Sequence, residues 1–181
     1  MLTRTAIGGG DIVLAAPEGY CIDRRSVRRD RASSFAVLAR CDTLGARGFF
    51  EAQDQALITV ITEARPQAKQ PTKAGLSASS GGTVTATRVI GGQPFIRVST
   101  ANHKVQGASA QHWRTALALN GHLIGLALYA RPGSDALDRN GAIILADLSR
   151  ETQPATSAKA NQTTLTVSGS GKNNSNISLL D

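Results

Sequence analysis

The chain has 181 residues, which suffices for one domain of ordinary size with tails. Hydrophobic residues make up 41% and aromatic residues 4%, so the core must rely on Val, Ile, Leu and Ala. No apolar run approaches the length of a transmembrane helix, which excludes a helical membrane span. The formal net charge of +7 favours an anionic partner such as nucleic acid, acidic lipid or acidic protein. A basic protein without such a partner is the alternative.

Strand signals dominate the first two thirds of the chain. Residues 1–10 end in three glycines and predict a flexible N-terminal segment. Residues 64–82 are polar and hold at most a short helix. Runs rich in β-branched residues, bounded by Gly and Pro turns, predict strands over residues 11–16, 20–22, 34–41, 55–64, 83–90 and 94–100.

A β-hairpin is the strongest local prediction. Asn120-Gly121 accepts positive φ at both turn positions and lies between two apolar runs. A two-residue turn places Trp113 opposite Leu128 and gives one face of large apolar residues. The other face has a floor of small residues around Gly125, which suits a helix packing close. Both faces are therefore expected to be covered.

A helix and a tail are expected after the hairpin. Ser134 or Asp135 can cap a helix over residues 135–151, whose apolar residues recur at helical spacing. Gly141 within it suggests a close approach to the floor around Gly125. Residues 152–181 have too few apolar side chains to offset ordering entropy and predict a disordered polar tail. Two exceptions are a possible strand over residues 164–168 and an apolar tip formed by Ile177, Leu179 and Leu180.

The resulting fold class is α+β, with a mostly antiparallel sheet of about six to seven strands and the C-terminal helix packed on one face. The domain spans residues 11–151, between the flexible segment 1–10 and the tail 152–181. Cys21 and Cys41 each end a strand-like run, and the two runs are expected to be neighbours. We therefore predict a disulfide, with two buried thiols as the alternative. A disulfide implies an exported or periplasmic protein. Residues 1–10 lack the apolar run of a signal peptide, so a cytoplasmic location stays open.

The most charged stretch lies at residues 24–31. Its arginines can bind phosphate or carboxylate, because the guanidinium fork matches both. Alternatively they stay solvated, since Asp23 and Asp30 partly neutralise them. The arginines are Arg24, Arg25, Arg28, Arg29 and Arg31.

No stretch carries a catalytic signature, and no cofactor is expected. The three histidines, His103, His112 and His122, lack the spacing of a zinc motif. His112 begins a predicted strand, and His122 is expected to be partly exposed beside the turn. A small enzyme that uses His112 or His122 with a nearby acid stays an alternative.

The order of elements resembles the PsbP-like family, an α/β/α sandwich shared by extrinsic photosystem proteins and a Ran-binding nuclear import factor. The turn Pro17-Glu18-Gly19-Tyr20 and a tryptophan, Trp113, before a late hairpin and closing helix carry the resemblance over roughly residues 11–150. It implies a non-catalytic protein that docks onto larger assemblies, and it supplies no active-site residues. The family usually has a helix between residues 64 and 82, where this chain has almost none.

We therefore expect a non-enzymatic binding or assembly module that docks onto a larger, membrane-associated complex with an acidic surface. The partner-binding residues are the five arginines together with Ile177, Leu179 and Leu180. A nucleic-acid-binding protein that works through the same arginines is a further alternative, although aromatic residues suited to base stacking are scarce.

Overall fold

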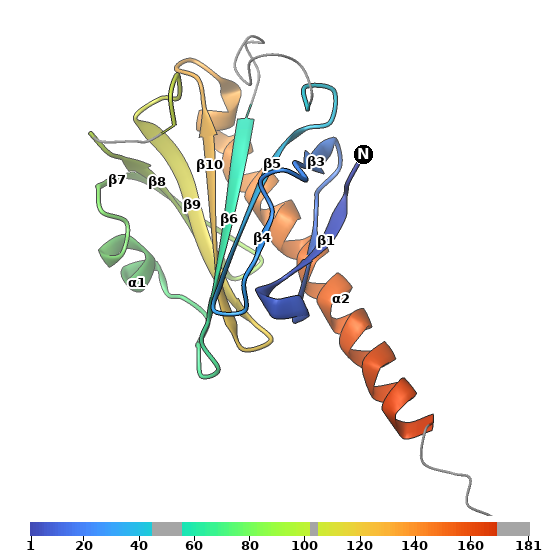
Figure 1. Ribbon diagram of the computed structural model, residues 1–181. Helices are drawn as coiled ribbons and strands as arrows, with labels where there is room; N and C mark the ends of the chain where they lie inside the picture. The colour runs from blue at the N-terminus through green and yellow to red at the C-terminus, as the bar shows by residue number, and fades with distance from the viewer. Residues whose placement is uncertain (45–55, 102–104, 170–181) are drawn as a thin grey trace, which may run out of the picture.

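The computed structural model describes residues 1–44, 56–101 and 105–169, with side chains as far as residue 159. In this part of the chain, one antiparallel sheet of eight strands carries a long C-terminal helix on one face (Figure 1). The predicted α+β fold class is confirmed.

The main sheet has the order β3-β5-β6-β10-β9-β8-β7, and a short β4 also pairs with β5. The four longer strands predicted before residue 101 are confirmed to within one residue at each end, because their apolar residues alternate with the strand period. The strands are β3 (Tyr20–Ile22), β4 (Arg28–Arg29), β5 (Ser33–Arg40), β6 (Ala56–Ala64), β7 (Thr83–Ile90), β8 (Gln93–Ser99), β9 (Gln111–Leu119) and β10 (His122–Ala130).

The hairpin of β9 and β10 has the predicted register. Asn120 and Gly121 turn with φ of 48° and 75°, as a two-residue turn with positive φ requires. Leu119 then pairs with His122, and Trp113 pairs with Leu128. The hairpin lies inside the sheet, with β6 on one side and β8 on the other.

The C-terminal helix packs on the face opposite to the one expected. A 3-10 turn, η2 (Asp135–Leu137), leads into α2 (Arg139–Gly169). Trp113, which is 1% exposed, donates from Nε1 to the carbonyl of Leu137 at 3.0 Å. The Cβ of an alanine at position 141 would lie 2.5 Å from Trp113 Cδ1. The prediction that Gly141 approaches the floor around Gly125 is therefore wrong, because the large apolar face offers the helix more area to bury.

The first ten residues also differ from the prediction, because they are folded. They contain β1 (Arg4–Ile7), which pairs with β2 (Ile12–Ala15) in a separate two-stranded sheet. The three glycines between them form the turn η1 (Gly8–Gly10), with φ of 60°, 65° and 101°. The flexible segment expected there is thus a hairpin, and fully buried Ile7 and Ile12 anchor it in the core.

The start of the predicted disordered tail differs from the prediction as well, because it is helical. Helix α2 continues through residue 169, and its later turns project beyond the sheet (Figure 1). Residues 164–168, expected as a possible strand, are helical. Thr152 and Thr156 are buried and accept hydrogen bonds from the backbone N–H groups of Ala15 and Val13 at 3.3 and 3.0 Å. Contacts with β2 thus stabilise a stretch whose own composition favours disorder.

The predicted disulfide is present. Cys21 pairs with Ala39 in the ladder of β3 and β5, and Cys41 follows at the end of β5. The two sulfurs are bonded, with the Cα atoms 4.9 Å apart. The argument that the two strand-like runs are neighbours is therefore correct.

A short helix, α1 (Lys73–Ala78), lies on the face of the main sheet opposite α2. The Thr72 hydroxyl accepts from Gly75 N at 3.1 Å and caps its first turn. Leu76 packs on Ile96 and Val98 of β8. The structure thus agrees with the expectation of at most a short helix between residues 64 and 82.

Candidate functional site

The arginine-rich segment runs along the outer side of β5. It includes β4, whose Arg28 and Arg29 pair with Phe35 and Ser34. All five arginines of the segment are exposed. The segment lies here because the strands before and after it in the chain pair with each other; its charge does not set the position.

The arginines differ in what they contact. Arg29 donates to the Ala6 carbonyl at 3.1 Å and to the Thr5 hydroxyl at 2.9 Å, so it fastens β4 to β1. Arg25 lies 3.4 Å from the Asp23 carboxylate. Arg28 donates to the Arg25 carbonyl, a neutral partner, and forms no ion pair with an acid of the described residues. Of these three arginines, Arg28 is therefore the best suited to the expected binding role and Arg29 the least.

Arg28 shares a cross-strand row with apolar residues. It pairs with Phe35, and Phe35 pairs with Ile61 of β6. Ile61 pairs with Gly125 of β10, which pairs with Ala116 of β9. Residues directly opposite each other point to the same side of a sheet. We call this side, opposite α2, the open face.

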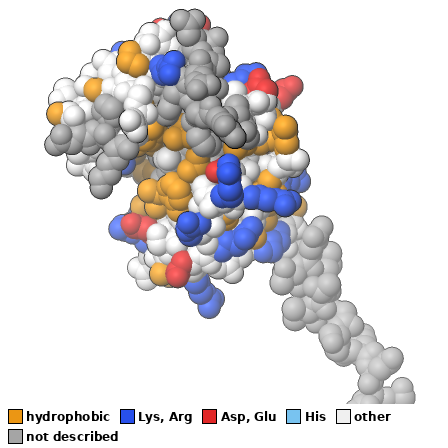
Figure 2. Space-filling view, turned by 45° about the horizontal axis from the view of Figure 1, so that its top comes forward, with side chains coloured by type: hydrophobic (Ala, Val, Ile, Leu, Met, Phe, Trp, Pro, Cys, Tyr) orange, Lys and Arg blue, Asp and Glu red, His pale blue; other side chains and the backbone are white. Residues whose placement is uncertain are grey.

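The open face is apolar and only partly covered by described elements. Among these, α1 packs on it, over β8. Beside α1 lies a groove of about 390 Å³ on β6, β9 and β10. Ile61 borders it and is 47% exposed, which is unusual for a large apolar residue near the middle of a sheet. On the side that Figure 2 presents, hydrophobic side chains gather beside a group of Lys and Arg side chains.

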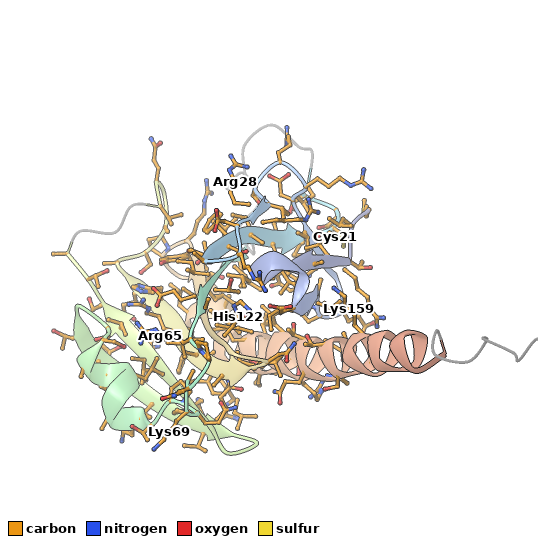
Figure 3. All side chains as sticks on the ribbon, turned by 60° about the horizontal axis from the view of Figure 1, so that its bottom comes forward. Cys21, Arg28, Arg65, Lys69, His122 and Lys159 are labelled. Carbon is orange, nitrogen blue, oxygen red and sulfur yellow. A yellow bond between two sulfur atoms is a disulfide. The ribbon has the colours of Figure 1, made fainter. Side chains whose placement is uncertain are left out.

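Basic side chains border the groove. Arg114 lies in its wall and donates to the Ser80 carbonyl at 2.7 Å, a neutral partner that leaves its charge intact. Arg65 lies 3.0 Å from Glu63 in an exposed ion pair, which water screens strongly. Figure 3 shows Arg65 and Lys69 together near α1, away from Arg28. Positive charge therefore lies on more than one side of the apolar row formed by Phe35, Ile61, Gly125 and Ala116.

The two described histidines do not form one site. His122 faces the α2 side and lies next to the turn, whereas His112 faces the open side near the other end of the hairpin. Strand geometry separates them by roughly 20 Å along β10. The two histidines therefore belong to different parts of the structure.

His122 is also more buried than expected. The η1 turn covers it, since a Cβ at Gly8 would lie 3.0 Å from its ring, and its Nε2 lies 3.3 Å from the Asp11 carboxylate. The prediction of partial exposure is wrong, because a segment far away in sequence packs over the turn. His112 begins β9 as expected and stacks on Tyr129, with ring centroids 4.8 Å apart.

Several predicted residues cannot be placed. Ile177, Leu179 and Leu180, expected as a partner-binding tip, lie outside the described residues, as does His103. In the described ranges, no group of three His, Cys, Asp or Glu side chains is arranged to hold a metal ion. None of the helices described there has the length and apolar character that a membrane span needs.

The sequence reasoning did not single out Ile61 as a surface residue. Its strand was predicted from a run rich in β-branched residues, and the outward position of Ile61 depends on pairing with β5 and β10. The floor around Gly125 was identified, with Ala116 and Ala127 beside it, but was assigned to the chain's own helix. Comparison with known proteins finds no matching family model, no matching curated protein and no matching solved structure.

Proposed function

We propose that this protein is a non-enzymatic binding module that docks through its open face onto the acidic surface of a larger protein complex. The observation that supports this most is the row from Arg28 through Phe35, Ile61 and Gly125 to Ala116. It joins the arginine segment to a row of apolar residues, of which Ile61 is exposed and the others are half-buried, on a single face.

The chemistry of this face suits a protein partner. Interfaces combine an apolar centre, which provides binding energy, with polar and charged surroundings that select the partner. Here the centre is the strip around Ile61, and the surrounding charges are Arg28, Arg65 and Arg114. Because Glu63 is the one acid in the groove's described lining, the face favours acidic over basic partners.

The disulfide supports an exported setting for this complex. Structural disulfides persist in oxidising compartments and are rare in the cytosol. We therefore place the proposed partner among exported or membrane-associated proteins. The resemblance in element order to the PsbP-like family, if it reflects kinship, would imply the same kind of docking.

Photocrosslinking from the open face tests the proposal. A photoreactive phenylalanine analogue at position 61 should crosslink one defined acidic protein in the native host. Ile61→Glu should weaken capture of that protein at least tenfold, because it places a carboxylate in the apolar centre opposite an acidic surface. The readout is the amount of the identified protein recovered with purified variant bait.

Ile143→Glu is the matched control, since Ile143 is 42% exposed, close to the 47% of Ile61, and lies on α2, across the sheet from the open face. It should leave capture unchanged, and thermal unfolding should show both variants folded. Equal capture by the Ile61 variant and the parent chain would refute the proposal. Nucleic acid in the captured fraction, with steep salt dependence, would instead favour a nucleic-acid-binding protein.

A further inference from the structure

We infer that the open face binds an amphipathic α-helix of the partner, with acidic residues along both edges of its apolar side. This inference rests on the proposed function and adds the form of the ligand. It starts from the groove over β6, β9 and β10, whose floor and borders are both described.

The floor of the groove is made of small residues. Gly125 and Ala127 of β10 lie beside Ala116 of β9, and larger side chains rise around them, Ile61 on one side and Leu76 of α1 on the other. A helix is a cylinder about 10 Å wide, and it approaches a sheet closely where the floor carries small side chains. A strip of two to three strands is about as wide as one helix.

The position of α1 sets where a second helix fits. Helix α1 packs over β8 through Leu76. Neighbouring helices lie about 8–10 Å apart, which equals two strand spacings of about 4.8 Å. Two strands from β8 in the sheet order is β10, which holds Gly125 and Ala127. The small-residue floor therefore lies at the place that a helix beside α1 would occupy.

The length also matches a helix of ordinary size. Strands β6 and β10 have nine residues each. Nine residues of strand span about 30 Å, which is the length of a helix of about 20 residues.

The charges around the floor define the edges of this helix. Arg65 and Arg114 line the groove, and Arg28 lies in the same cross-strand row as Gly125. Carboxylates that flank the apolar stripe of a bound helix would meet these guanidinium groups. A helix with lysines in those positions would be repelled.

An extended segment would bind elsewhere. A strand adds to a sheet by pairing with a free edge, because only there are backbone donors and acceptors unpaired. The groove lies in the middle of the sheet, where β6 pairs with β5 and β10, and β10 pairs with β6 and β9. The face therefore favours a helix over an extended peptide.

Three synthetic peptides of one length test the inference on the full chain. The first has Leu at positions i, i+3, i+4 and i+7, Glu on both flanks and Ala on the far side. The second has the same composition with Leu and Glu alternating, and the third replaces every Glu of the first by Lys. We expect the first to bind at least tenfold more tightly than either of the others, as measured by fluorescence anisotropy.

Gly125→Phe tests where the peptide binds. Among the described residues, a Cβ at position 125 meets one non-neighbouring atom within 4 Å, the Ile61 carbonyl oxygen at 4.0 Å, so the ring can point into the groove without disturbing the strand. The variant should weaken binding of the acidic helical peptide at least tenfold. The control is Ile143→Phe, which places the same ring on the exposed side of α2, across the sheet from the groove, and should leave binding unchanged.

Equal binding of the alternating peptide, or helical-peptide binding that Gly125→Phe leaves intact, would overturn the inference. So would a dimer in light scattering that Gly125→Phe dissociates, because a second copy would then occupy the face. If no peptide binds but crosslinking from position 61 to an acidic protein persists, the helix inference fails and the proposed function stands. If Ile61→Glu leaves capture unchanged, the proposed function fails, whatever the peptides show.

Discussion

Gly141 and Trp113 fix the distance between α2 and the sheet. A Cβ at position 141 would lie 2.1 Å from the Ala136 carbonyl oxygen and 2.5 Å from Trp113 Cδ1. The indole is fully enclosed, and its N–H donates to Leu137, so it has little room to move. The glycine is thus required by packing, although its φ is ordinary.

Gly141→Ala should destabilise the fold by about 1–3 kcal/mol, as overpacking in a tight core does. This exceeds the gain of about 1 kcal/mol that alanine brings to a helix interior. Urea unfolding measures the difference. Gly125→Ala on the open face is the control and should not lower the free energy of unfolding, since its Cβ has room. A Gly141→Ala variant as stable as the parent would contradict this account of the contact.

Tyr20 links stability to alkaline pH. Burial raises the pKa of its phenol above 10.0, and the nearby positive charge of Arg40 partly opposes this by favouring the phenolate. The folded state therefore holds the phenol proton more tightly than the unfolded chain does. This contribution is complete below the unfolded pKa and is lost as the pH rises through the folded pKa.

Replacing Tyr20 by Phe keeps the ring and removes the titration. The free energy of unfolding of the parent should therefore fall relative to Tyr20→Phe as the pH rises from about 9 to about 11, around the ordinary tyrosine pKa of about 10. Chemical unfolding of both proteins at each pH measures the difference. Parallel pH profiles would contradict a raised pKa of Tyr20.

Helix α2 packs beside strand β2 and provides hydrogen-bond partners for its backbone. Thr152 and Thr156, one helical turn apart, accept from the N–H groups of Ala15 and Val13. Their hydroxyls also lie 3.5 Å from the carbonyl oxygens of the same two residues. Threonine side chains therefore satisfy backbone groups of β2 that the β1 ladder does not use.

Thr152→Val together with Thr156→Val keeps the side-chain shape and removes both hydroxyls. We expect a loss of about 1–3 kcal/mol for each backbone N–H left without a partner in a buried place. Faster amide hydrogen exchange at Val13 and Ala15 would locate the effect. Ser157→Ala is the control, because that exposed hydroxyl donates only within α2, to Gln153 O. Unchanged exchange at both amides would contradict the contact.

Across the whole molecule, the two faces of the main sheet differ in how they are covered. One face is closed by α2 and the β1–β2 hairpin, whose buried residues form the main core. On the other face, within the described part of the chain, α1 packs over β8 through a smaller cluster, and the groove lies beside it. This asymmetry, with basic residues around the groove, is why we assign binding to the open face.

Local chemistry alone determined much of the fold. Positive φ at Asn120-Gly121 fixed the hairpin and its register, and runs rich in β-branched residues between Gly and Pro turns located β5, β6, β7 and β8. The disulfide followed because Cys21 lies in β3 and Cys41 directly follows β5, and these two strands pair. These features depend on short stretches or on neighbouring strands, so the sequence carries them directly.

Tertiary structure decided the remainder. Which face α2 covers, the folding of the N-terminal hairpin, the burial of His122 and the exposure of Ile61 all depend on distant segments. The Val13–Thr156 contact joins residues 143 positions apart, and the His122–Asp11 contact joins residues 111 apart. No local pattern encodes such pairings, because the area that each segment buries is set only when all the layers are assembled.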